Sequence, residues 1–212
     1  KKFSKKKIAE YPFPRITYKD AMLKYGSDKP DLRNPLYIID LSEFFSRCTF
    51  KPFIGRTVRA IKVSGHMSKG FHEKMLEYAM KIGMKGLGYL EVQEDLSYKG
   101  PIDKFIPEEL KKELISLAKL EKNDTIFFIA DSEKRATELA GQIRTELGKR
   151  LDLIDEDVFK FCWIIDFPMF ELDDHEKLAF SHNPFSMPQG GLDALEHQNP
   201  LDILAYQYDI VC

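Results

Sequence analysis

The sequence contains few cysteines, and their spacing points to no cross-link or metal site. The three cysteines, Cys48, Cys162 and Cys212, lie far apart among 212 residues, without a Cys-x-x-Cys or Cys/His ligand pattern. This spacing implies neither a disulfide framework nor a zinc site. Unpaired cysteines of this kind are typical of a reducing compartment, so we expect a cytoplasmic protein.

Long apolar runs and an excess of one charge are also missing. The apolar runs are only a few residues long, so we expect no membrane-spanning segment. Lys and Arg number 32 against 34 Asp and Glu, a net charge of −2, which gives no overall attraction to nucleic acid. With 43% hydrophobic and 31% charged residues, the composition is that of a folded globular chain.

The two ends of the sequence predict a fragment of a longer protein. The chain starts without Met, and the segment before Glu10 has five lysines but lacks the apolar stretch of a secretory signal. Residues 203–212 have the pattern of a strand that is still running at the last residue. We therefore expect that the sequence begins and ends inside a larger chain.

Helices and strands alternate through the middle of the sequence. Apolar residues at helical spacing, with caps and stop signals, predict helices over residues 17–25, 42–48, 68–82, 107–122 and 132–147. β-Rich or alternating segments predict strands over residues 57–63, 87–92, 125–130, 159–166, 178–182 and 203–212. The short segment 178–182 is expected to pair with 159–166, and Gly148 is expected to end the preceding helix.

This order of elements leaves two sheet architectures open. Strands and helices that interleave from residue 57 to 148 favour a parallel α/β sheet. An antiparallel sheet with helices on one face is equally compatible, because the loops before residues 107 and 125 permit either connection. The pattern predicts a two-layer domain of helices and strands between two turn-rich junctions, at residues 25–35 and 183–191.

Polar residues at these junctions have both a functional and a structural interpretation. His182 and Asn183 precede Pro184 in a rigid turn that could present polar side chains to a ligand, or could be a surface turn. Asp166 ends an apolar strand, where its carboxylate could serve a site or bind backbone amides of the turn. Lys29 and Arg33 could hold a phosphate, or could form ion pairs within a connector.

Other catalytic patterns are not supported by the residues. The glycines Gly83, Gly86 and Gly88 lie between a helix and a strand, whereas phosphate-binding glycine loops lead from a strand into a helix. His66, His72, His175 and His197 have no metal-ligand spacing, and no Ser-His-Asp arrangement or pair of catalytic acids is recognisable. We expect residues 173–175 to form a solvated hairpin tip.

Two long segments at the junctions resemble a known family. Residues 13–33 (FPRITYKDAMLKYGSDKPDLR) and 163–188 (WIIDFPMFELDDHEKLAFSHNPFSMP) are similar to bacterial-type aspartyl-tRNA synthetases. The first segment resembles the part that leaves the catalytic core, and the second resembles the part that returns to it. The intervening residues are similar in position and length to the insertion called the GAD domain, a module shared with the B and E subunits of tRNA-dependent amidotransferases.

The resemblance implies a domain organisation and a fold. Residues 1–33 and 158–212 would be segments of a class II catalytic core with an antiparallel sheet, and residues 34–157 would be the GAD insertion. Because GAD modules pack an antiparallel sheet against helices, the implied fold class is α+β. An alternative from another class is a non-catalytic GAD interaction module, although residues 163–188 would have no place in it.

The resemblance also implies a reaction and one site residue. Such an enzyme activates L-aspartate with ATP and Mg²⁺ to aspartyl-adenylate, then acylates tRNA(Asp) or, in some members, also tRNA(Asn), and works as a homodimer. In the family a His-His-Pro-Phe turn places its first His in the aspartate pocket, and His182 occupies that position here. Asn183 replaces the second His, so it can donate a hydrogen bond but cannot titrate. Because the ATP-binding arginine motifs are missing from residues 1–212, we expect this stretch to be inactive alone.

Overall fold

The computed structural model describes residues 4–173 and 175–212, which form two compact units. Unit 1 comprises residues 1–22, 28–34 and 154–212, and unit 2 comprises residues 23–27 and 35–153. The chain therefore leaves the first unit, builds the second and returns to the first. Among the described residues, no helix combines the length and hydrophobicity needed to cross a bilayer.

Unit 2 is built on a five-stranded sheet in which all neighbouring strands are antiparallel. In spatial order its strands are β3 (Ile38–Asp40), β4 (Thr57–Val63), β7 (Thr125–Asp131), β5 (Gly88–Val92) and β6 (Tyr98–Lys99). The long central pair runs from Thr57 opposite Asp131 to Val63 opposite Thr125. The α+β class is confirmed, and the parallel arrangement favoured by the pattern alone is wrong.

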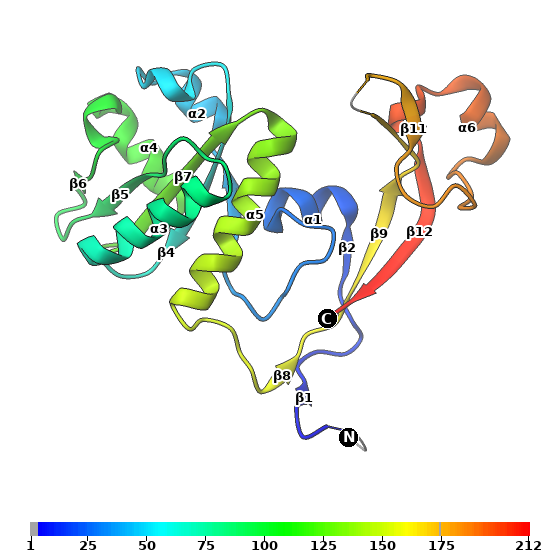
Figure 1. Ribbon diagram of the computed structural model, residues 1–212, viewed down its shortest axis with the longest axis horizontal. Coiled ribbons are helices and arrows are strands. Elements are labelled where there is room, and N and C mark those ends of the chain that lie inside the picture. The colour runs from blue at the N-terminus through cyan, green and yellow to red at the C-terminus, as the bar shows by residue number, and fades with distance from the viewer. Residues whose placement is uncertain (1–3, 174) are drawn as a thin grey trace. The chain divides into compact units, whose positions relative to one another are not determined.

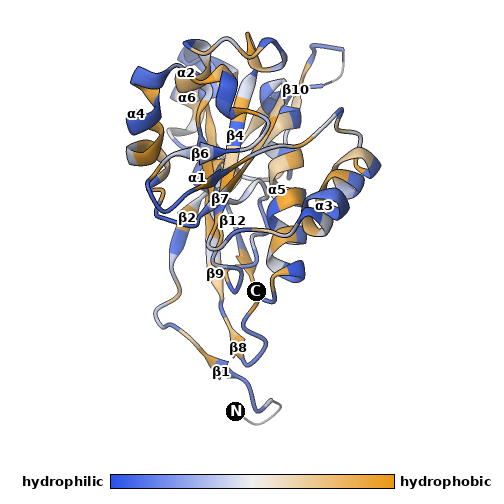
Figure 2. Ribbon diagram, turned by 90° about the vertical axis from the view of Figure 1, so that its left-hand side faces the viewer, coloured by the Kyte–Doolittle hydropathy of each residue, from blue (hydrophilic) through white to orange (hydrophobic). Residues whose placement is uncertain are grey.

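Helices cover both faces of this sheet (Figure 1). The elements α2 (Ser42–Ser46) and α4 (Glu108–Ala118) pack on one face, and α3 (Lys69–Lys81) and α5 (Glu133–Arg150) pack on the other. The prediction of two layers is therefore wrong, and unit 2 has three. The reason lies in the central strands, where apolar side chains such as Phe127 and Phe128 are buried on opposite faces. Figure 2 shows these apolar strands between helices with polar outer surfaces.

Some helix ends of unit 2 follow local chemistry and others do not. The helix predicted over residues 107–122 ends at Ala118, with Lys119 next in the left-handed conformation. Ser68 caps α3 by accepting a hydrogen bond from the Phe71 amide, and Gly83 follows that helix with φ at +90°. The sequence predicted that α5 ends at Gly148. That prediction is wrong, because the helix continues to Arg150. Gly148 is buried beside Leu147, so packing against the sheet outweighs the weak helix preference of glycine.

A close backbone contact fixes α5 against the turn that follows α1 (Tyr18–Tyr25). A Cβ atom added at Gly141 would lie 2.5 Å from the carbonyl oxygen of Gly26, and Gly26 itself has φ at +69°. Both glycines are therefore required, one for the approach and one for the left-handed backbone. Gly26 also ends α1 as the sequence predicts, and Thr17 caps that helix by accepting from the Asp20 amide at 3.1 Å.

Unit 1 contains a three-stranded sheet with a hairpin beside it. The strand β9 (Cys162–Pro168) lies in the centre, antiparallel to β12 (Leu204–Val211) and parallel to β2 (Arg15–Thr17). The strand β11 (Leu178–Phe180) was predicted to pair with β9. That prediction is wrong, because β11 pairs with β10 (Phe170–Leu172). The chain turns at Met169, so the nearest partner for β11 is the segment just before it. The predicted hairpin tip follows β10, except that Asp174 lies outside the described residues.

The remaining elements of the chain are short. Unit 1 also holds the parallel pair β1 (Lys7–Ile8) and β8 (Val158–Phe159), the helix α6 (Gly191–His197) and the 3-10 turn Pro200–Asp202. Two more 3-10 turns, Lys51–Phe53 and Asp103–Phe105, lie in unit 2. These pieces connect the main elements and add no further layer.

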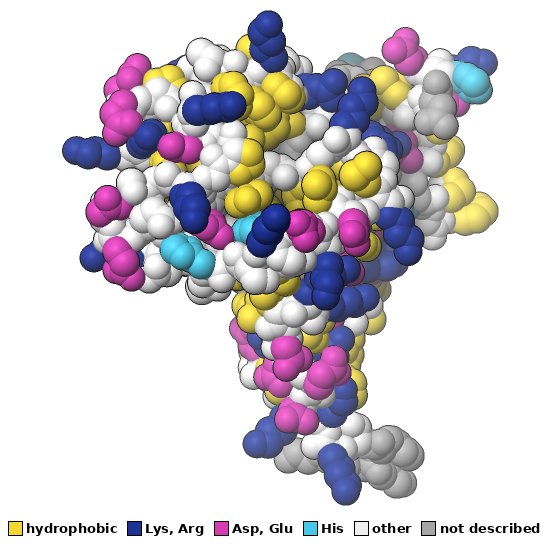
Figure 3. All heavy atoms as spheres, turned by 60° about the vertical axis from the view of Figure 1, so that its left-hand side comes forward, with side chains coloured by type: hydrophobic (Ala, Val, Ile, Leu, Met, Phe, Trp, Pro, Cys, Tyr) yellow, Lys and Arg dark blue, Asp and Glu magenta, His cyan; other side chains and the backbone are white. Residues whose placement is uncertain are grey.

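Charged groups are mostly mixed or paired. Figure 3 shows Lys and Arg interspersed with Asp and Glu over the face it presents, as the small net charge suggests. Within unit 1, Arg33 forms two hydrogen bonds with Asp31, at 3.0 and 2.9 Å, and approaches Glu156 at 3.5 Å. Lys29 pairs with Asp28 at 2.6 Å. These contacts support the connector interpretation of residues 27–33 over a phosphate site.

Candidate aspartate-binding turn

The turn that holds His182 and Asn183 follows the hairpin of β10 and β11 in unit 1. Ser181 anchors its start, because the Ser181 amide donates to the carbonyl oxygen of Met169 at 3.1 Å. His182 is exposed in this chain. The His182 imidazole therefore lies at the protein surface, one residue after the hydrogen bond between Ser181 and Met169.

Two aromatic rings and one hydroxyl orient the His182 imidazole. Phe167 of β9 and Tyr18 of α1 meet it edge-on, with ring centroids 4.9 and 5.6 Å away. The Ser181 Oγ atom lies 2.8 Å from His182 Nδ1. When that hydroxyl donates to Nδ1, the neutral ring carries its proton on Nε2, which can then donate a hydrogen bond to a ligand.

Asn183 shapes the turn through its side chain. Its Oδ1 atom accepts a hydrogen bond from the Phe185 amide at 2.9 Å, an Asx turn over Pro184. The Asn183 amide donates to Gln207 Oε1 of β12 at 3.4 Å, and the Ser186 hydroxyl approaches the same oxygen at 3.5 Å. The side-chain oxygen of Asn183 is thus used inside the turn, and its Nδ2 atom is the group that could reach a ligand.

A hollow of about 500 Å³ lies in unit 1 along β9 and β12. Polar groups at its lining include Arg15, Asp166, Gln189 and Gln207. Its aromatic and apolar lining consists of Trp163, Ile165, Ala205, Tyr206 and Tyr208. Gln207 connects this hollow to the turn, since it lines the hollow and accepts the hydrogen bond from Asn183.

Asp166 lies at an irregularity between β9 and β12. The register shifts between Ala205 and Tyr208, and Asp166 has φ at +55°. Its Oδ1 atom accepts from Gln189 Nε2 at 2.8 Å, and the same amide approaches the carbonyl oxygen of Ala205 at 3.4 Å. The Asp166 carboxylate therefore holds Gln189 at the hollow and carries a negative charge into its lining.

This arrangement is suited to holding a small polar molecule. Arg15, Gln189 and Gln207 offer hydrogen-bond donors at the hollow, whereas His182 and Asn183 are not among its lining residues. Among the described residues, no group of three or more His, Cys, Asp or Glu side chains could ligate a metal ion. The donors at the hollow suit a ligand that accepts hydrogen bonds.

Some of these residues were not identified from the sequence. Gln189 and Gln207 reach the site only through long-range strand pairing, and Arg15 lies on a short strand whose neighbour is residue 163. One available signal was the polar Gln207 within the strand 203–212, whose other residues are apolar or aromatic except for Asp209. The turn at residues 182–185 was identifiable because Asn and Pro are strong turn formers.

Comparison with known proteins identifies one family over the full length of the chain. Residues 1–212 match the family described as tRNA synthetases class II (D, K and N). The chain is 54% identical to an aspartate–tRNA(Asp/Asn) ligase of Ehrlichia chaffeensis over 219 residues, covering 100% of the chain and 37% of the relative. It is 53% identical to the protein of the same name from Anaplasma phagocytophilum, with 100% and 36% covered, and 52% identical to that of a Wolbachia strain of Drosophila simulans, also with 100% and 36% covered.

These matches include both units and the turn at His182. The chain spans slightly more than a third of the length of the curated relatives it matches. The family model matches every residue, so one family accounts for the whole chain. The chain belongs to the class II tRNA synthetases of the D, K and N group.

Proposed function

We propose that the chain is a segment of an aspartate–tRNA ligase. That enzyme activates L-aspartate with ATP to aspartyl-adenylate and transfers the aspartyl group to tRNA(Asp) and also to tRNA(Asn). The support is the name shared by relatives that are 50–54% identical over the whole chain, aspartate–tRNA(Asp/Asn) ligase. Charging assays of the full-length enzyme with transcripts of the two tRNAs test the double specificity.

We propose further that unit 2 corresponds to the GAD insertion predicted over residues 34–157, and that unit 1 belongs to the class II catalytic core predicted over residues 1–33 and 158–212. The bounds differ at the junctions, since residues 23–27 fall in unit 2 and residues 34 and 154–157 fall in unit 1. Two observations support this division. The chain leaves unit 1 and returns to it, as an insertion requires, and the unit 2 sheet is antiparallel throughout. A stand-alone interaction module gains no support, because the family match continues through residues 158–212.

His182 is the residue that we assign to substrate binding. Its ring is held by Phe167, Tyr18 and Ser181, so little conformational entropy is lost when a ligand binds. An imidazole N–H supplies a donor to a carboxylate of L-aspartate, and protonation adds a positive charge. Asn183 contributes through Nδ2, in a lesser role, because its oxygen is committed to the Asx turn.

The remaining parts of the reaction fall outside these residues. Because the resemblance places the ATP-binding arginine motifs outside residues 1–212, we assign ATP and its Mg²⁺ to the rest of the ligase. We place the enzyme in the cytoplasm as a homodimer. Residues 1–212 alone should give no aspartate-dependent pyrophosphate exchange, and clear exchange by this segment would contradict the assignment.

The deciding observation is the oriented imidazole of His182, and the deciding experiment is His182→Ala in the full-length ligase. A charge-assisted hydrogen bond contributes about 1.5–3 kcal/mol, so kcat/KM for aspartate should fall roughly tenfold to a hundredfold. The KM for ATP should change little. Asn183→Ala is the matched control, with a smaller loss because a neutral hydrogen bond contributes about 1 kcal/mol.

A purely structural role for His182 gives a different result. If the ring only shapes the turn before Pro184, His182→Ala lowers the melting temperature and leaves the kinetic constants for aspartate unchanged. Measuring both quantities on one preparation separates the two roles. Unchanged aspartate kinetics together with reduced stability would refute the assignment of His182 to substrate binding.

A further inference from the structure

Unit 2 contains a pocket of about 640 Å³ that the proposed aminoacylation does not use. It opens where β3 stops pairing with β4. The last paired residues are Ile38 and Ile61, and beyond them the two segments 35–37 and 62–64 separate and form opposite walls. The end of α4 and the segment after α5 close the remaining sides. Such a break in a sheet edge leaves room for a ligand beside an otherwise packed domain.

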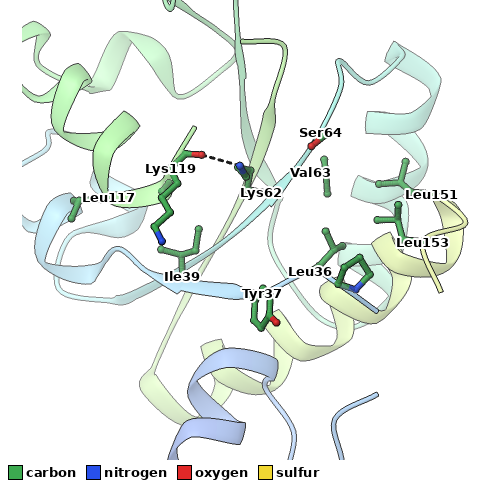
Figure 4. Close-up of a pocket in the computed structure, with 12 residues that line it drawn as sticks. Leu36, Tyr37, Ile39, Lys62, Val63, Ser64, Leu117, Lys119, Leu151 and Leu153 are labelled. Carbon is green, nitrogen blue, oxygen red and sulfur yellow. Dashed lines mark hydrogen bonds between the residues drawn. The ribbon is translucent and has the colours of Figure 1, made fainter. Parts of the chain in front are cut away.

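The walls of the pocket are mostly aliphatic. Figure 4 shows Leu36, Val63, Leu151 and Leu153 gathered on one side, with Tyr37 below them. On the other side the Lys119 side chain extends along the wall toward Ile39 (Figure 4). The pocket therefore has an apolar body and a cation at one end, the two features that an amphipathic anion needs.

The charge of Lys119 is not neutralised within the part of the chain that the structure describes. Lys62, the other lysine of the pocket, pairs with the buried carboxylate of Asp124 at 3.2 Å. Its Nζ atom also donates to the carbonyl oxygen of Lys119 at 2.8 Å. Lys119 is exposed where it lines the pocket, and among the described residues no ion pair to its Nζ is formed, so one positive charge lies at the open side of the pocket.

Lys119 also occupies a backbone position that favours glycine. It follows α4 with φ at +48° and ψ at +47°, and the amide of Leu120 donates back to the carbonyl oxygen of Ile115 at 2.9 Å. This helix ending most often uses glycine, because an L side chain is strained there. The hydrogen bond from Lys62 holds the strained turn in place. Glycine would be less strained at this position, so the backbone does not require the lysine side chain.

We propose that this pocket binds a small amphipathic carboxylate, with its aliphatic chain against Leu36, Val63, Leu151 and Leu153 and its carboxylate on Lys119. The apolar wall contributes affinity by burial, and the single uncompensated ammonium selects one negative charge. The site lies wholly within unit 2 and does not depend on the aspartate-binding turn.

The experiment compares three probes on residues 1–212 by calorimetry and by backbone amide NMR shifts. Octanoate carries both features, 1-octanol only the apolar chain and acetate only the charge. We expect octanoate to bind most tightly and to shift amides at residues 35–37, 62–64 and 117–119. Lys119→Gly should weaken octanoate roughly tenfold to a hundredfold, to the level of 1-octanol, while the melting temperature stays level or rises.

Lys122→Met is the control, because Lys122 is exposed nearby but does not line the pocket. It should leave octanoate binding unchanged. Equal binding of octanoate and 1-octanol, full affinity in Lys119→Gly, or shifts confined to β12 of unit 1 would each overturn the proposal. Should Lys119→Gly lower the melting temperature, Lys119→Met, which keeps the chain length, becomes the deciding variant with the same expected loss.

Discussion

The two sheets of this molecule differ in how completely they are covered. In unit 2, helices shield both faces, and Phe44, Phe45, Phe127 and Phe128 are at most 1% exposed. In unit 1, Cys162 and Ile164 on one face of β9 are fully buried. On β12, the side chains of Tyr206, Tyr208 and Ile210 remain 66%, 66% and 52% exposed.

This difference shows that similar strand sequences can form a sheet covered on both faces or a sheet with one exposed face. Unit 2 supplies every layer that its sheet needs from residues close in the sequence. Unit 1 leaves an aromatic surface exposed, and exposed patches of this kind mark contact surfaces. Stability should therefore depend strongly on buried residues of unit 2 and weakly on the exposed strand face of unit 1.

The largest expected effect comes from the centre of unit 2. Phe127→Ala removes a fully buried ring that contacts His72 and Tyr89, and should cost about 3–5 kcal/mol of unfolding free energy. Tyr206→Thr on β12 replaces one side chain that favours strands with another at an exposed position, and should change stability by less than about 0.5 kcal/mol. Chemical denaturation of both variants measures the contrast, and similar losses would break the comparison.

A second test uses two helical glycines of unit 2. Gly141→Ala places a Cβ atom against the backbone of Gly26 and should cost about 1–3 kcal/mol. Gly70→Ala in α3 meets no atom within 4 Å and should stabilise by about 0.5 kcal/mol, because alanine favours the helix. Thermal unfolding of the two variants should shift in opposite directions. A stabilising Gly141→Ala would show that α5 can move away from the turn at Gly26.

The third test concerns a buried cation at the edge of the same sheet. Arg59 is 4% exposed, and its partner across the strands is Asp40. Burial alone would raise the pKa of Asp40, but hydrogen bonds from Ser42 and the Arg59 guanidinium lower it overall. Asp40→Asn should cost about 1–3 kcal/mol at neutral pH, less than for a fully buried pair because Asp40 is half exposed.

The pH dependence of this pair has a defined sign. Because the folded-state pKa of Asp40 is lowered, its carboxylate stabilises the fold above the unfolded value near pH 4, and this contribution is lost as the pH falls further. The stability gap between the wild-type chain and Asp40→Asn should therefore shrink below about pH 4. A gap that stays constant from pH 7 to pH 3 would exclude the ion pair as its cause.

Local signals predicted the elements, whereas long-range pairing decided their arrangement. The strand over residues 57–63 and the helix ends at Gly26 and Gly83 follow from neighbouring residues, and all three are confirmed. The extension of α5 past Gly148 and the pairing of β11 with β10 depend on contacts that no local pattern contains. The antiparallel sheet order could be expected only from the family resemblance.

The candidate site also combines residues that were predictable from the sequence with residues that were not. The turn with His182 and Asn183 was predictable because its residue types and its resemblance to the family agree. Its supports were not, since Tyr18 precedes His182 by more than 160 residues and Gln207 arrives from another strand. The sequence thus indicated a candidate binding residue, whereas the residues that orient its side chain are determined by the fold.

Because two of the three thiols are buried, their chemical reactivity can report local unfolding of the chain. Cys48 lies in the core of unit 2 and Cys162 in the sheet of unit 1, while Cys212 is exposed. Desolvation raises the pKa of both buried thiols to about 11, so they react slowly with alkylating reagents while the fold is closed. A pulse of maleimide would mark Cys212 at once, and later modification of the other two would time the opening of each unit without any engineered label.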